Sequence, residues 1–127
     1  MIFFQDSFIV FLVHALSGGN GNDKLSGDWG ADYLTGGNNA DIFGYVTAQD
    51  SLVGLGKDTI ADFTPGADKI NLAGVDANAS VAGNQAFSTA QIVYIGGIAT
   101  IDILGSTQDM QIQLNGTPAI NWTDIVL

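Results

Sequence analysis

The chain has 127 residues, of which 46% are hydrophobic, enough for the core of one domain or of a small domain with an appended repeat block. All 13 acidic residues are aspartate and only three lysines oppose them, so the net charge is −10, which favours cations and disfavours nucleic acid, anionic lipid and other polyanions as partners. The absence of cysteine excludes both a disulfide framework and a thiolate metal site.

The first 13 residues are apolar, with an unbroken run from Phe8 to Val13 and a single charge at Asp6. The run is too short to span a membrane, so we expect no membrane insertion. The segment also lacks the basic region that begins a signal peptide. We expect it to form a strand that caps the first coil of the repeats described next; a truncated start or an expression-derived extension is the alternative.

The following stretch, residues 18–44, divides into three blocks of nine residues: GGNGNDKLS, GDWGADYLT and GGNNADIFG. They follow the pattern G-G-x-G-x-D-x-U-x, in which U is apolar. The first block matches throughout, the second has Asp28 at the second position, and the third has Asn39 at the fourth. A flexible Gly/Asn-rich linker is the alternative, but linkers do not keep an apolar residue in a nine-residue phase.

Two weaker blocks, residues 9–17 and 45–53, extend the register, and we interpret them as decayed coils. The apolar column then contains Leu16, Leu25, Leu34, Phe43 and Leu52. The aspartate column contains His14, Asp23, Asp32, Asp41 and Asp50, so His14 stands where an aspartate belongs.

Each nonapeptide predicts a six-residue loop, rich in residues that tolerate positive φ, followed by a three-residue strand with its central apolar side chain inward. Two nonapeptides complete one coil, so the loop Gly18–Asp23 stacks on the loop Gly36–Asp41. Carboxylate and carbonyl oxygens of stacked loops form a ligand set that suits Ca²⁺ better than Mg²⁺. The predicted metal-binding residues in the repeats are Gly19, Gly21, Asp23, Asp28, Gly30, Asp32, Gly37, Asn39 and Asp41.

The remainder of the chain reads as short strands separated by turn residues. The expected strands are 58–63, 69–72, 91–95, 98–104, 110–114 and 122–127, and a short helix within 76–90 is an alternative to irregular structure there. Gly96-Gly97 predicts a hairpin between the third and fourth of these strands. The expected fold is therefore all-β, with a parallel β-roll that continues into a C-terminal β-sandwich. The expected division is residues 1–17 for the N-terminal capping strand and degenerate coil, 18–53 for the roll and 54–127 for the sandwich.

Three segments carry a resemblance to known proteins: GADYLTGGNNADIF (30–43), DTIADFTPGADKINL (58–72) and the terminal DIVL (124–127). The nonapeptides resemble RTX (repeats-in-toxin) units of proteins exported by type I secretion. Over residues 18–72 and, more loosely, 91–127 the chain resembles the C-terminal domain of serralysin-type metalloproteases, which also occurs in secreted lipases and in the R-modules of mannuronan epimerases; residues 73–90 carry no resemblance. Asn71 departs from the aspartate that is usual there.

The resemblance implies that Asp50 and Asp58 close the last calcium positions, near Asp41, and that the terminal DIVL is an export signal. For Asp62 and Asp68 we expect turn or capping roles.

No H-E-x-x-H zinc motif and no G-x-S-x-G nucleophile motif is present in the sequence, and His14 is its single histidine. We therefore expect no catalysis by this chain; a covalently attached catalytic domain would lie outside it. The resemblance implies a secreted, extracellular module that binds calcium, folds in response to it, and meets the type I secretion machinery through its C-terminus. The alternatives are a polysaccharide (alginate)-binding module, disfavoured by the charge unless calcium bridges, and a free-standing structural or adhesive calcium-binding protein.

Overall fold

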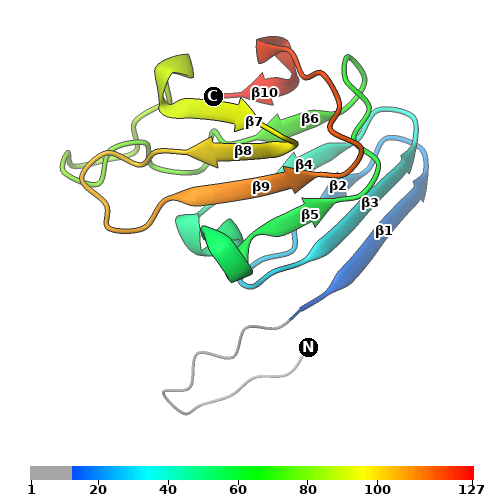
Figure 1. The fold of residues 1–127 in the computed structure, drawn as a ribbon, viewed down its shortest axis with the longest axis horizontal. Coiled ribbons are helices and arrows are strands. Elements are labelled where there is room, and N and C mark those ends of the chain that lie inside the picture. Colours follow the sequence, from blue (N-terminus) through cyan, green and yellow to red (C-terminus); the bar gives the residue numbers. More distant parts are fainter. Residues whose placement is uncertain (1–12) are drawn as a thin grey trace.

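A computed structural model describes residues 13–127, and in this part of the chain all regular structure is β-strand or short 3₁₀-helix. Two sheets face each other, and the chain passes repeatedly from one to the other (Figure 1). The strand that we expect within residues 1–13 lies almost wholly outside the described residues. No helix in residues 13–127 is long and apolar enough to cross a membrane.

The larger sheet has six strands in the order β1-β3-β5-β9-β8-β7, and the smaller has four in the order β10-β6-β4-β2. The strands of the larger sheet are β1 (Ala15–Asn20), β3 (Tyr33–Asn38), β5 (Asp58–Ile60), β7 (Ile92–Ile95), β8 (Ile98–Ile101) and β9 (Met110–Leu114). Those of the smaller sheet are β2 (Lys24–Leu25), β4 (Ile42–Gly44), β6 (Lys69–Asn71) and β10 (Ile125–Val126).

The repeats form the coils that their period predicts. Strand β1 pairs in parallel with β3, with Leu16 opposite Leu34, and β2 pairs in parallel with β4, with Leu25 opposite Phe43. Both offsets are 18 residues, so two nonapeptides make one coil. The expectation of an all-β parallel roll is confirmed.

A further coil follows that the nine-residue phase did not reveal. Ile60 of β5 lies opposite Leu34 and Ile70 of β6 lies opposite Phe43, at offsets of 26 and 27 residues. An offset of 26 is two nonapeptides plus eight residues (26 − 18 = 8), so the register resumes after an insertion at 45–52. Residues 53–61 (VGLGKDTIA) then fit the pattern from its second position, and residues 63–71 (FTPGADKIN) fit its fourth, sixth and eighth positions.

The interpretation of residues 45–53 as a decayed coil is therefore wrong. This segment contains the 3₁₀-helix η1 (Ala48–Ser51) and leads into a second one, η2 (Gly54–Gly56). Leu52 is only partly buried, whereas Ile60 is fully buried and occupies the next place in the apolar column.

The C-terminal strands extend the same two sheets. Strand β9 pairs in parallel with β5, and β10 pairs in parallel with β6. The hairpin expected at Gly96-Gly97 is present, with β7 antiparallel to β8 and Ile95 opposite Ile98, and β8 is antiparallel to β9. Because β5 and β6 continue both sheets without a break, the division of the chain at residue 53 stays a prediction.

The short helix considered within 76–90 is absent apart from η3 (Thr89–Gln91) at its end. The Asp76 carboxylate accepts hydrogen bonds from the backbone N–H groups of Asn78 and Gln85, 3.1 Å each, and these contacts fold the segment as a turn. The last 3₁₀-helix, η4 (Trp122–Asp124), leads into β10.

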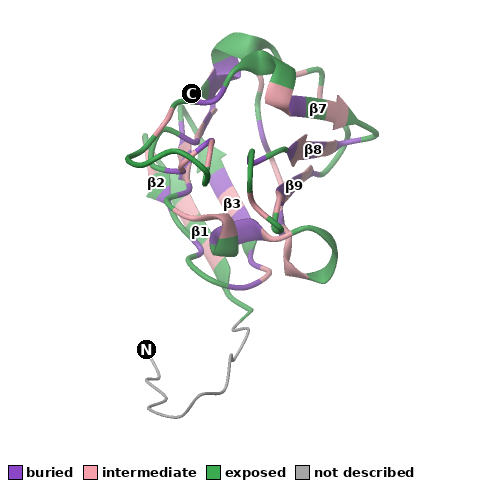
Figure 2. Ribbon diagram, turned by 90° about the vertical axis from the view of Figure 1, so that its left-hand side faces the viewer, coloured by how far each residue is buried: buried purple, intermediate pink, exposed green. Residues whose placement is uncertain are grey.

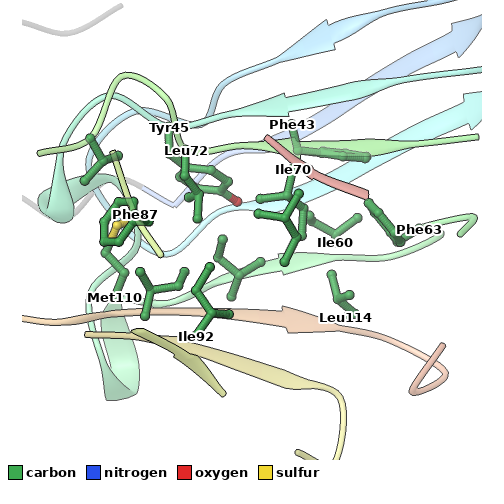
Figure 3. Close-up of a cluster of buried hydrophobic side chains, with 14 of the residues drawn as sticks. Phe43, Tyr45, Ile60, Phe63, Ile70, Leu72, Phe87, Ile92, Met110 and Leu114 are labelled. Atoms are coloured by element: carbon green, nitrogen blue, oxygen red, sulfur yellow. The ribbon is translucent and has the colours of Figure 1, made fainter. Parts of the chain in front are cut away.

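The core lies between the two sheets and contains the apolar residue of each repeat strand from Leu25 onward, with Leu16 partly buried against it (Figures 2 and 3). Leu34, Phe43, Ile60 and Ile70 are all at most 1% exposed. In β9 the side chains alternate, with Met110, Ile112 and Leu114 buried and the intervening glutamines partly exposed. Inward-facing side chains of two packed sheets thus hold the loops of successive coils in fixed register.

Candidate metal site

The loops that connect the sheets form two stacks. The first loop stack contains residues 18–23, 36–41 and 62–68, which lead from the larger sheet to the smaller. The second loop stack contains residues 27–32 and 53–58, which lead back. This placement follows from the alternation of the nonapeptides between the two sheets.

A ladder of aspartates runs through each stack. In the first stack the N–H of Asp23 donates to Oδ1 of Asp41 (2.9 Å), and the N–H of Asp41 donates to Oδ1 of Asp68 (2.9 Å). In the second stack the N–H of Asp32 donates to Oδ1 of Asp58 (2.8 Å). The sixth residue of each nonapeptide thus joins its loop to the next loop of the stack.

His14 occupies the first rung of the second ladder. Its backbone N–H donates to Oδ1 of Asp32 (2.7 Å), and its ring Nδ1 lies 3.0 Å from the same oxygen. At the position where the other repeats have an aspartate, His14 therefore places a ring nitrogen against the Asp32 carboxylate.

The second carboxylate oxygen of four ladder aspartates is buried without a hydrogen-bond partner. These atoms are Oδ2 of Asp23, Asp32, Asp41 and Asp58. Asp32, Asp41 and Asp58 are at most 2% exposed. A buried carboxylate oxygen without a donor is costly, and a cation is the usual way to stabilise it.

The first glycine of each nonapeptide makes room for this oxygen. A Cβ atom at Gly18 would lie 2.7 Å from Oδ2 of Asp23, and Cβ atoms at Gly27 and Gly36 would collide with Oδ2 of Asp32 and Asp41. The loops therefore fold closely around the unpartnered oxygens, and the oxygens fit a hard cation such as Ca²⁺.

The second and fourth positions of all three nonapeptides have left-handed backbone. Their φ angles are 90°, 62° and 98° at Gly19, Asp28 and Gly37, and 107°, 125° and 82° at Gly21, Gly30 and Asn39. Aspartate and asparagine tolerate this region better than other residues with a Cβ. The two departures from the pattern therefore preserve the shape of the loop.

Burial dominates the electrostatics of the second stack. It raises the pKa of the Asp58 carboxyl to about 8, and the nearby Asp32 carboxylate adds to the rise against the lowering effect of the Asp32 N–H. Burial also raises the pKa of Asp32, although contacts with His14 oppose it. The fully buried Tyr45 hydroxyl lies beside the Asp58 carboxylate without a hydrogen bond of standard geometry, and burial, followed by the charge of Asp58, raises its pKa well above the ordinary value. This end of the core holds more acidic groups than its backbone donors satisfy.

The structure does not bring Asp41 to one site with Asp50 and Asp58, as the resemblance implied, although Asp50 lies near enough to Asp58 for its charge to add to the rise that burial causes in the pKa of Asp58. Asp41 and Asp58 belong to different loop stacks. The Asp50 carboxylate accepts hydrogen bonds from the N–H groups of Val46 and Thr47 and from the Thr47 hydroxyl, at 2.8–3.1 Å, and so caps η1. Local donors, two backbone N–H groups at Oδ2 and the Thr47 hydroxyl at Oδ1, satisfy both of its oxygens.

Asp68 and Tyr45 are the site neighbours that sequence reasoning missed. Alignment of residues 63–71 to the repeat, with an insertion allowed, would have placed Asp68 in the ladder; no signal marked Tyr45. Among residues 13–127 no three His, Cys, Asp or Glu side chains converge on one point. An ion here would need backbone carbonyls for its remaining ligands.

A family model described as "Peptidase M10 serralysin C terminal" matches residues 9–125. The chain belongs to this serralysin C-terminal family. The family is the non-catalytic C-terminal domain of serralysin-type proteases. Comparison with curated proteins gave no significant match.

This serralysin C-terminal chain is also similar in structure to a subunit of a mannuronan C5-epimerase from Azotobacter vinelandii. One subunit superposes with a TM-score of 0.62 at 27% identity, covering 89% of this chain and 66% of that one, slightly less than two thirds of its length. A second subunit has 23% identity over 91% of this chain and 86% of its own, with a TM-score of 0.37.

Proposed function

We propose that this chain is a non-catalytic, calcium-binding module of a secreted protein, whose folding calcium controls and whose C-terminus meets a type I secretion machinery. The observation that carries the proposal is the set of four buried, unpartnered carboxylate oxygens in the loop stacks. The family supports the larger setting, in which the parent protein is a secreted serralysin-like metalloprotease.

The predicted ligands divide between side chains and backbone. Asp23 and Asp41 would hold an ion in the first stack, and Asp32 and Asp58 in the second. The loop residues Gly19, Gly21, Asp28, Gly30, Gly37 and Asn39 would offer carbonyl oxygens. Bound calcium would supply the positive charge that these buried carboxylates lack.

The metal dependence of folding follows from charge and chain entropy. Without a cation the ladder aspartates must either stack like charges or take up protons. They also lie within glycine-rich loops, whose ordering is entropically expensive. Extracellular calcium sites have dissociation constants of roughly 10⁻⁴–10⁻³ M, so the chain would be loosely folded in a cytosol and ordered outside. Calcium at about 100 times Kd stabilises each site by about 2.7 kcal/mol.

Circular dichroism and thermal melts in EGTA and in millimolar calcium test the proposal. We expect calcium to increase the β-signal and raise the melting temperature, and magnesium at equal concentration to do less. An unchanged spectrum and melting temperature would refute calcium-controlled folding. Isothermal titration of Asp32→Asn, with the exposed Asp102→Asn as its matched control, locates the effect: the first should bind less calcium and the second as much as the parent chain.

A second candidate function is binding of a polysaccharide, favoured by the likeness to one epimerase subunit at 27% identity. The net charge of −10 opposes an anionic polymer unless calcium bridges it. Calorimetry with alginate in calcium separates the two candidates, because heat of binding would be seen only for a polysaccharide module.

A further inference from the structure

Three aspartates lie around loop 62–68: Asp62, Asp68 and Asp124. Unlike the ladder aspartates of the preceding loops, each has both carboxylate oxygens hydrogen-bonded. Asp68 accepts the N–H of Asp41 at Oδ1 (2.9 Å) and the N–H of Thr64 at Oδ2 (2.8 Å). Asp41, the preceding rung of the same ladder, is equally buried but has an unpartnered Oδ2. Two neighbouring carboxylates in one ladder therefore differ in their need for a cation.

Asp62 satisfies the backbone donors of the loop beneath it. Its Oδ1 accepts the N–H of Gly36 (2.9 Å) and its Oδ2 accepts the N–H of Gly37 (2.8 Å). Asp62 is the single residue between the units 53–61 and 63–71, so no equivalent exists between loops 18–23 and 36–41. A carboxylate that accepts two consecutive N–H groups joins loops 36–41 and 62–68 directly.

Asp124 joins the next loop in the same way. Its Oδ1 accepts the N–H of Gly66 (2.9 Å), and its Oδ2 accepts the N–H of Asn121 (2.8 Å). The Lys69 ammonium lies 3.7 Å from Oδ1 and offsets part of the charge. The six oxygens of Asp62, Asp68 and Asp124 are all satisfied by the protein.

We propose that calcium binds at Asp41 and Asp58, each of which has one unpartnered oxygen, Oδ2, and that loops 36–41, 62–68 and 121–124 are joined without metal by Asp62, Asp68 and Asp124. The inference rests on the proposed calcium function and divides the molecule accordingly. The N-terminal coils depend on calcium, and the last coil is held by carboxylates that accept backbone N–H groups. The last coil then offers a preformed surface on which the earlier coils order when calcium arrives.

Native mass spectrometry of the full chain in calcium tests the division with a matched pair of variants. Asp41→Asn and Asp68→Asn remove the same charge from adjacent, equally buried rungs. We expect Asp41→Asn and Asp58→Asn each to bind one ion fewer than the parent chain, and Asp68→Asn to bind as many. Loss of an ion in Asp68→Asn would overturn the inference. Should that variant unfold, Asp62→Asn serves in its place, with an unchanged ion count expected and a lost ion decisive against it.

Amide exchange followed by NMR on the unmodified chain in EGTA supplies a second readout. The N–H groups of Gly37 and Asp41, held by Asp62 and Asp68, should exchange at least tenfold more slowly than those of Asp23 and Asp32, held by Asp41 and Asp58. Equal rates would overturn the inference and leave the calcium function standing. An unmodified chain that binds no calcium at all would refute both.

Discussion

Left-handed glycines in the loops are not interchangeable, because only some lie against another coil. Gly37 has a φ of 98°, and a Cβ atom there would collide with the carbonyl oxygen of Gly19 in the loop below. Gly21 has a similar φ of 107°, but a Cβ atom there would meet nothing within 4 Å. The first residue is constrained by backbone and packing, the second by backbone alone.

We therefore expect Gly21→Ala to cost about 1–2 kcal/mol of folding free energy in calcium, the usual penalty for a left-handed alanine. Gly37→Ala should cost clearly more, because the loops must also move apart. Urea denaturation of both variants measures the difference. Equal losses would mean that the stacked loops are not in close contact.

The pH dependence of the metal-free chain follows from the raised pKa of Asp58. An unfolded aspartate has a pKa of about 3.9, whereas burial holds that of Asp58 at about 8. Between these values the folded chain binds more protons than the unfolded chain, so its stability falls as pH rises, by up to about 1.4 kcal/mol per unit. Burial shifts the pKa of Asp32 and Asp68 in the same direction.

In EGTA the urea midpoint should consequently be higher at pH 5 than at pH 7.5, and Asp58→Asn should flatten this trend. In saturating calcium the trend should reverse, since the metal requires ionised ligands. A midpoint in EGTA that rises from pH 5 to pH 7.5 would contradict the assignment.

At the scale of elements, the buried apolar residue of each strand defines the register of the coils better than the loop residues do. Ile60 is fully buried in β5, whereas Leu52, which keeps the nine-residue phase, is only partly buried. Ile60→Ala should therefore destabilise the chain by about 2–5 kcal/mol, and Leu52→Ala by much less. Thermal melts in calcium compare the two, and a larger loss for Leu52→Ala would contradict the register.

The first coils could be predicted from the sequence because each nonapeptide contains every residue that determines its shape. These are residues that tolerate left-handed backbone, a ladder aspartate and an inward apolar side chain. The insertion could not be predicted, because Asp50 and Leu52 occur at the spacing of the repeat but do not occupy the ladder or the apolar column. Asp50 caps η1, and the neighbouring Ser51 hydroxyl donates to the carbonyl of Gln111, 60 residues away. A contact that distant leaves no periodic trace in the sequence.

The candidate site was predictable to a similar extent. The aspartates at the sixth position of the nonapeptides do form ladders, as a stacked-loop arrangement requires. The continuation of the ladders through Asp58 and Asp68 depended on recognising the insertion. The capping contacts of Asp62 arise from one extra residue between two units, which pattern matching treats as noise.

At the scale of the whole molecule, the net charge of −10 predicts two different effects of cations on stability. Any salt screens the repulsion between aspartates, whereas only a suitable divalent ion binds to the buried oxygens. Sodium chloride screens charges beyond about 8 Å at 0.15 M, so it should raise the melting temperature in EGTA modestly. Millimolar calcium at the same ionic strength should raise it much further, because the unpartnered oxygens are buried and screened little by salt. Melting curves in matched sodium, magnesium and calcium buffers measure this, and equal effects of magnesium and calcium would argue against an oxygen cage suited to calcium.

The 18-residue offset between β1 and β3 gives the molecule the geometry of a screw thread. Each pair of nonapeptides advances the chain by one interstrand spacing, about 4.8 Å, without altering the cross-section. A duplicate of residues 18–35 inserted after Thr35 would lengthen the thread by one pitch and leave the rest of the molecule intact. Each added pair of nonapeptides would therefore lengthen the roll by one interstrand spacing. The C-terminal strands, on which the last coil packs, would stay unchanged.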